Sequence, residues 1–151
     1  MKTIPRNSDD ISIYYFPDDK TITLQSDQTV IGDLESPELY ISDCNSSNVT
    51  LHTGVDAKSD WWGHKYKHDG SSWSANADFK GKHNLASDIN DSVTTIPVVN
   101  SNPFTTSGTV QIKDEKITYT GIDGTNLTGA TRGASSTSAA SHDRNSTVVQ
   151  I

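Results

Sequence analysis

The chain has 151 residues, of which 32% are hydrophobic, and its formal net charge is −7 at neutral pH. This length suits one ordinary domain or two small ones, and so little apolar material would leave a small β domain marginal by itself unless an assembly buries more of its surface. The negative charge argues against a nucleic-acid backbone as the main partner, because phosphate binding needs clustered lysines and arginines.

Charge distribution, cysteine content and the N-terminal sequence indicate the compartment. Residues 1–80 hold 13 acidic and 7 basic residues, an excess that keeps a chain soluble or faces a basic partner. Cys44 is the only cysteine, so no intramolecular disulfide can form. Residues 1–10 lack the apolar stretch of a signal peptide, and no apolar run approaches the roughly 20 residues of a membrane helix. We therefore expect a protein folded in a reducing compartment, without membrane insertion.

Short strands separated by turns are predicted through the first half of the chain. Residues 11–16 and 21–24 alternate apolar and polar side chains, and a turn at 17–20 would pair these two strands with each other. Further short apolar runs lie at 30–31, 39–41 and 49–51. Strand-length runs about every ten residues are typical of an all-β sandwich, barrel or meander.

Aromatic residues follow these strands. The alternation over residues 62–68 predicts a strand with an aromatic face, and Trp73 would return beside Tyr66 on a partner strand. Flat aromatic faces stack on carbohydrate rings, so these residues are a candidate binding surface. The alternative, which we favour, is that they are the largest core side chains of an apolar-poor domain. The candidate surface consists of Trp61, Trp62, Tyr66 and Trp73.

Metal binding and catalysis find little support in the sequence. His64 and His68 would suit one metal ion on a helix, but on a strand four residues span roughly 13 Å, too far for a shared ion. No serine stands in a Gly-x-Ser-x-Gly elbow, and Gly-rich phosphate loops are absent. Asp114 and Glu115 are adjacent at a predicted turn, where carboxylates are normally solvated, and Arg132 is expected to bond locally. We therefore expect no metal, no cofactor and no enzymatic activity.

The second half of the chain begins after a weakly patterned stretch at 75–84, which we interpret as a linker. Residues 92–99 are predicted to form a strand, and Pro97 places that strand at a sheet edge because proline cannot donate to the ladder. A short strand is expected around Leu127, and residues 147–151 close the chain with an apolar strand.

A β-hairpin over residues 107–121 is the clearest local prediction. Val110 and Ile112 alternate with polar residues, and Ile117 and Tyr119 do the same after a short polar turn. A period of two puts each apolar pair on one face of a strand.

The sequence as a whole predicts an all-β fold of two small antiparallel β domains, sandwich-like or barrel-like, joined by a short linker. The first domain would span residues 1–80 and the second 85–151. Unpaired strand edges are templates for neighbouring chains. The candidate inter-subunit edges are marked by Ile11, Ile13 and Tyr15 in the first domain and by Val148 and Ile151 in the second.

Five sequence pieces occur in a fixed order from about Leu85 onward. They are Ser92-Val-Thr-Thr-Ile-Pro-Val98, Phe104 with Ser107-Gly-Thr-Val-Gln-Ile112, Glu115-Lys-Ile-Thr-Tyr-Thr-Gly121, Leu127-Thr-Gly-Ala-Thr-Arg-Gly133 and Thr137-x-Ala-Ala-x-His142. In order and spacing this region resembles a small β module of tailed-bacteriophage virion proteins. The module makes structural contacts in tail, baseplate and fibre-associated proteins and carries no catalytic residues to transfer. The resemblance covers a little under half of the chain and does not extend to residues 1–84.

The resemblance implies a non-enzymatic structural protein of the virion, in the tail, the baseplate or a fibre attachment. Such a protein would be made in the host cytoplasm and would dock between other virion proteins as a homo-oligomer in symmetric copies. The alternative is a binding module, either a tail-tip protein that recognises a host glycan receptor or a capsid decoration protein. A tail-associated glycan-degrading enzyme is the weakest candidate, because no carboxylate pair can be placed.

Overall fold

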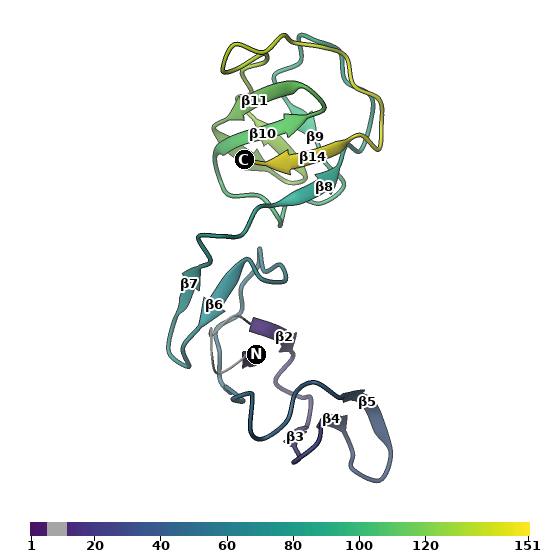
Figure 1. Ribbon diagram of the computed structural model, residues 1–151, viewed down its shortest axis with the longest axis vertical. Coiled ribbons are helices and arrows are strands. Elements are labelled where there is room, and N and C mark those ends of the chain that lie inside the picture. The colour runs from purple at the N-terminus through teal and green to yellow at the C-terminus, as the bar shows by residue number, and fades with distance from the viewer. Residues whose placement is uncertain (6–11) are drawn as a thin grey trace. The chain divides into compact units, whose positions relative to one another are not determined.

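The structure is a computed structural model that describes residues 1–5 and 12–151, and these divide into two compact units, Met1–Ala77 and Asp78–Ile151. The described residues form strands and turns and no helix, so the predicted all-β class is confirmed (Figure 1). Every strand pairing is antiparallel, and the sheets formed by these residues have two to four strands and do not close into a barrel. The described part of the chain contains no helix that could span a bilayer.

The first unit is built from three small sheets and a modest core. Its strands are β1 (Lys2–Pro5) paired with β2 (Ser12–Phe16), the meander of β3 (Ile22–Leu24), β4 (Thr29–Gly32) and β5 (Pro37–Ile41), and the hairpin of β6 (Tyr66–His68) and β7 (Trp73–Ala75). The core cluster is formed by Ile4, Ile31, Ile41, Cys44 and Val49. Ile22 and Leu24 of β3 pack against it because side chains two apart on a strand share one face.

Strand pairing in the first unit differs from the sequence prediction. The turn at 17–20 forms, with the Lys20 N–H bonded to the Pro17 carbonyl at 3.2 Å, but it joins two different sheets. Strand β2 pairs with β1, and β3 pairs with β4, so the predicted pairing of 11–16 with 21–24 is wrong. The partner of β2 is the N-terminal stretch, which had no pattern that marked it as a strand.

The second unit contains two sheets around one core. Its strands are β8 (Lys82–Asn84), β9 (Ile96–Pro97), β10 (Gly108–Ile112), β11 (Glu115–Tyr119), β12 (Gly121–Asp123), β13 (Asn126–Thr128) and β14 (Thr147–Gln150). The sheet orders are β11-β10-β14-β8 and β12-β13-β9. The largest buried apolar side chains include Leu85, Ile96, Phe104, Ile112, Ile117, Tyr119 and Leu127.

The predicted hairpin over 107–121 is confirmed as β10 and β11, which pair from Gly108↔Tyr119 to Ile112↔Glu115. All four of its alternating apolar side chains are buried in the core. Only two residues form the turn, and Lys113 adopts a φ of 52° there. The edge position of Pro97 is also confirmed, since β9 lies at the end of its sheet. The stretch assigned to the linker includes β8, which pairs with β14.

The strand edges proposed for contact between chains need correction. Strand β14 lies between β10 and β8 (Figure 1), so Val148 belongs to an inner strand. The Ile151 N–H donates to the Thr109 carbonyl at 3.0 Å. Both hydrogen-bonding edges of β14 are occupied, and we no longer expect it to pair with a neighbouring chain. Ile11 lies outside the described residues. Ile13 and Tyr15 belong to β2, which pairs with β1 alone among the strands that the structure describes.

Candidate functional site

A buried carboxylate begins strand β11, directly after the hairpin turn. Side chains at alternate positions of β11 point inward, so the strand that buries Ile117 and Tyr119 also buries Glu115, which is 2% exposed. The expectation of a solvated carboxylate at this turn is therefore wrong for Glu115 and holds for Asp114, which is exposed.

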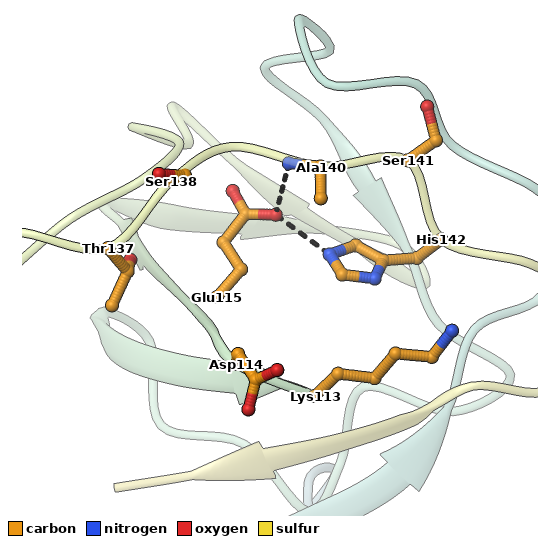
Figure 2. Close-up of a pocket in the computed structure, with 8 residues that line it drawn as sticks. All are labelled: Lys113, Asp114, Glu115, Thr137, Ser138, Ala140, Ser141 and His142. Atoms are coloured by element: carbon orange, nitrogen blue, oxygen red, sulfur yellow. Dashed lines mark hydrogen bonds and ion pairs between the residues drawn. The ribbon is translucent and has the colours of Figure 1, made fainter.

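Five donors surround the Glu115 carboxylate. Arg132 binds it through both oxygens, with Nε 2.8 Å from Oε1 and Nη2 2.8 Å from Oε2. The backbone N–H groups of Gly133 and Ala140 donate at 2.9 and 3.1 Å, and His142 Nε2 lies 2.7 Å away. Figure 2 shows the Ala140 and His142 contacts converging on one carboxylate oxygen. Because these donors come from residues 132–142, one side chain fastens that whole loop to the hairpin.

The electrostatics of this cluster fix its protonation state. Burial would raise the pKa of the Glu115 carboxyl, but the hydrogen bonds from Arg132, His142 and the two backbone N–H groups outweigh burial and lower that pKa to about 2. The carboxylate is therefore ionised at neutral pH and can only accept hydrogen bonds. It follows that the Nε2–H of His142 donates the hydrogen bond that Glu115 Oε2 accepts.

A surface pocket of about 590 Å³ lies beside this cluster (Figure 2). Glu115 and His142 contribute to its lining, and their side chains are hydrogen-bonded to each other. A carboxylate with a pKa of about 2 and five donors is a poor general base near neutral pH, because a base works best when its pKa lies near the working pH. The arrangement is suited to holding a loop in place. The pocket is lined by Lys113, Asp114, Glu115, Thr137, Ser138, Ala140, Ser141 and His142.

The first unit gathers its aromatic residues around Trp73. The Trp73 ring is met edge-on by Tyr15 at 5.4 Å, by Tyr66 at 6.2 Å and by His68 at 4.7 Å between ring centroids. The Trp61 ring extends the group through Tyr15, with 5.4 Å between the two ring centroids. Edge-to-face pairs of this kind contribute about 0.5–1.5 kcal/mol beyond the area that they bury.

Polar groups of the aromatic cluster are also bonded within the unit. Trp73 Nε1 donates to the Asp56 carbonyl at 2.9 Å, and the Tyr66 hydroxyl donates to the Asp60 carboxylate. Burial, and then this bond to Asp60, raise the pKa of the Tyr66 hydroxyl. The Lys58 ammonium lies 4.4 Å from the centroid of the Tyr66 ring, over its face.

The predicted binding residues thus lie in one region and are half-buried. The structure joins Trp61, Tyr66 and Trp73 through Tyr15, while Trp62 follows Trp61 in the chain and is also half-buried. Trp73 pairs with His68 and not with Tyr66 as predicted, because the connection between the strands is four residues long. The members of the cluster that the sequence did not suggest are Tyr15 and His52.

His64 and His68 lie in different surroundings. His64 is exposed in a turn with a φ of 66°, whereas His68 is 2% exposed and belongs to β6. In the residues that the structure describes, no group of three or more histidine, cysteine, aspartate or glutamate side chains is placed to hold an ion.

Sequence reasoning missed the Glu115–Arg132–His142 cluster, although a signal was present. Each of the three residues lies in a different one of the five sequence pieces, and Arg132 and His142 are the only charged or titratable residues of theirs. Comparison with protein-family models, curated proteins and solved structures finds no match for this chain.

Replacing Glu115 by glutamine should destabilise the second unit. An amide cannot accept from all five donors, and breaking a buried ion pair leaves the Arg132 charge uncompensated, so we expect a loss of about 3 kcal/mol. Hydrogen exchange in urea, followed on peptides from residues 108–142, measures the change.

The matched control for this change is Asp114→Asn, which alters the exposed neighbour and should change stability by less than about 0.5 kcal/mol. Tryptophan fluorescence reports on the first unit, where all three tryptophans lie, and should respond to neither variant. Equal urea sensitivity of the two variants would contradict a structural role for Glu115.

The second unit should also lose stability in acid through Glu115. Its folded pKa of about 2 lies below the ordinary value of 4.5, so its contribution is fully present above pH 4.5 and disappears as the pH falls toward 2. At about 1.4 kcal/mol per pH unit this amounts to about 3 kcal/mol. The stability difference between the natural chain and Glu115→Gln, measured by urea unfolding from pH 7 to pH 2, should shrink across that window. A difference that stays constant would refute the assignment.

Proposed function

We propose that this chain is a non-enzymatic structural protein of a tailed-bacteriophage virion, located in the tail, the baseplate or a fibre attachment. The supporting observation is that all five pieces of the motif order lie in one compact unit. The first four supply apolar side chains to a single core, including Ile96, Phe104, Ile117 and Leu127. The fifth is fastened to the third through the hydrogen bond between His142 and Glu115.

The chemistry of the second unit supports a scaffold. Its most conspicuous titratable group is an ionised carboxylate whose oxygens are already bonded, and this group joins the hairpin to residues 132–142. These bonds specify one arrangement of that loop. The second unit would serve as a fixed block between other virion proteins, in several symmetric copies.

Recognition of a glycan by the tryptophan cluster is the alternative, and the packing of that cluster argues against it. Sugar stacking needs an open ring face. Trp73 is contacted by three aromatic rings, and the Lys58 ammonium lies over the Tyr66 ring. These contacts favour the structural role for the aromatic residues of the first unit.

Purified virions of the phage that encodes this chain should contain it in several copies per particle. Mass spectrometry of density-purified particles measures its presence, and a particle reconstruction locates it, which separates a tail position from a capsid-surface decoration. A replication protein of the same phage is the negative control. Abundant chain in infected cells together with its absence from particles would refute the proposal.

A glycan array should give no specific signal with the purified chain. Because the Trp73 and Tyr66 rings are engaged within the unit, fluorescently labelled chain and its Trp62→Ala variant should bind equally weakly. Circular dichroism checks that the variant is folded. Saturable binding to one glycan class that Trp62→Ala abolishes, with the fold intact, would replace the purely structural role with receptor recognition.

A further inference from the structure

Large apolar side chains lie exposed on the β4–β5 hairpin of the first unit. Leu34 is 55% exposed, Leu39 is 45% exposed and Tyr40 is 55% exposed. The chain is poor in apolar residues, and Leu39 and Tyr40 are consecutive residues of β5, so one is exposed on each face of the sheet. These three residues therefore need an explanation that the core of the unit does not provide.

Strand β5 lies at the edge of its sheet. Its inner side pairs with β4, with Val30 opposite Tyr40 and Ile31 opposite Leu39. No described strand pairs with its outer side. Natural edges are usually blocked by lysines, prolines or bulges. Strand β5 carries no lysine; Pro37 and a register shift at Glu38 interrupt only the start of the strand, which leaves residues 39–41 as a regular edge. The remaining edge can accept an added strand through main-chain hydrogen bonds.

The hairpin is acidic throughout. Residues 32–44 contain four acidic residues and no basic residue. Lys20, just before β3, forms an ion pair with Glu38, with 2.5 Å between Nζ and Oε2. This pair neutralises one of the four acidic charges. Asp33 and Glu35 stand exposed in the turn that leads into β5, where Asp33 Oδ1 accepts the Glu35 N–H at 2.8 Å. The surface around the apolar residues thus keeps a local charge of −3.

A groove of about 620 Å³ lies beside the same turn. It is lined by Thr21, Thr23, Gly32, Asp33, Leu34 and Glu35. The carboxylates and the threonine hydroxyls provide several oxygen acceptors, which suit an ammonium or guanidinium group. Gly32 has a φ of 95°, and a Cβ there would lie 3.1 Å from Glu38 Cγ, so glycine leaves the space through which Glu38 passes to Lys20.

These observations together define the occupant. A second copy of this edge would bring two acidic strands together, and like charges across an interface cost free energy. A basic partner would instead meet complementary charge. We propose that β5 and its acidic turn dock an extended basic segment of another protein. That segment adds a strand beside β5, with side chains that meet Leu39 on one face of the sheet and Tyr40 on the other, and directs lysine or arginine toward Asp33 and Glu35. Only the identification of the partner as a virion protein rests on the proposed function.

Binding of a synthetic peptide tests the surface itself. The probe is the fluorescein-labelled, end-capped peptide Lys-Val-Lys-Val-Thr-Val-Lys, and its counterpart with glutamate in place of every lysine is the matched control. With the full chain, fluorescence anisotropy should show saturable binding of the basic peptide, at least tenfold tighter than the acidic one and weaker at higher salt. Equal binding of the two peptides, or no saturable binding of either at about 1 mM, overturns the proposal.

Variants locate the site on the chain. The double substitution Leu39→Lys with Tyr40→Lys places lysines on the edge and should weaken binding of the basic peptide at least tenfold. Val99→Lys is the matched control, because Val99 is a comparably exposed apolar residue of the second unit, at 53%, and binding should not change. All three residues are exposed, so thermal melts should match those of the natural chain. Undiminished binding by the double variant overturns the proposal.

A photo-crosslinking residue in place of Tyr40 identifies which protein contacts β5 in the assembled virion. In assembled virions the crosslinked peptide should come from a different protein and should carry more lysine and arginine than acidic residues. Crosslinks only between copies of this chain overturn the docking proposal and leave the virion role standing. If the chain binds the basic peptide but is absent from virions, the virion role is refuted and the docking proposal stands.

Discussion

The ionised carboxylate of Glu115 is the contact on which the second unit most depends. It fastens residues 132–142, a stretch of mainly small and polar side chains that bury little apolar surface. Within that stretch Ser135 and Ser136 both adopt a positive φ, a conformation that costs a non-glycine residue free energy and persists only where the surroundings hold it. The Thr137 hydroxyl helps, since it accepts the Lys116 N–H at 3.0 Å and donates to the Ala134 carbonyl at 2.7 Å. In this loop, hydrogen bonds and an ion pair provide the stabilisation that apolar packing provides in a sequence with more apolar residues.

The two units meet the shortage of apolar residues in different ways. The second unit concentrates its apolar side chains in one core and holds the polar loop at 132–142 with the buried Glu115–Arg132 ion pair. A buried pair of this kind adds little net stability over a well-packed apolar substitute, but it specifies one arrangement of the loop, because a displaced Glu115 or Arg132 would be left uncompensated. The first has a smaller core and adds a cluster of aromatic rings in edge contact, with Trp73 bonded to the Asp56 carbonyl. Aromatic rings offer the most burial per side chain, so this solution needs few residues.

The sequence allowed prediction of what depends on near neighbours. The β10–β11 hairpin followed from alternation, since each pair of inward residues is two positions apart. Glu115 was misplaced because the polar stretch at 113–116 was interpreted as the turn, whereas only Lys113 and Asp114 form it, and Glu115 takes the first inward position of β11. Its partners lie 17 to 27 residues further along the chain, beyond any local pattern. The position of β14 between β10 and β8 could not be predicted for the same reason. Alternation identifies a strand but does not say which strands will flank it.

The exposed hairpin of the first unit bears on how an assembly of such chains would hold together. Burying a large apolar side chain fully is worth about 1.5–3 kcal/mol, so completing the burial of Leu39 and Tyr40, each about half exposed, supplies about 1.5–3 kcal/mol in total. Association costs at least about 4 kcal/mol in lost freedom, so apolar contact alone would not retain a partner. Main-chain bonds along β5 and the charges of Asp33 and Glu35 would have to supply the remainder. A contact of this size is weak and reversible singly, and it becomes durable where symmetric copies engage the same partner together.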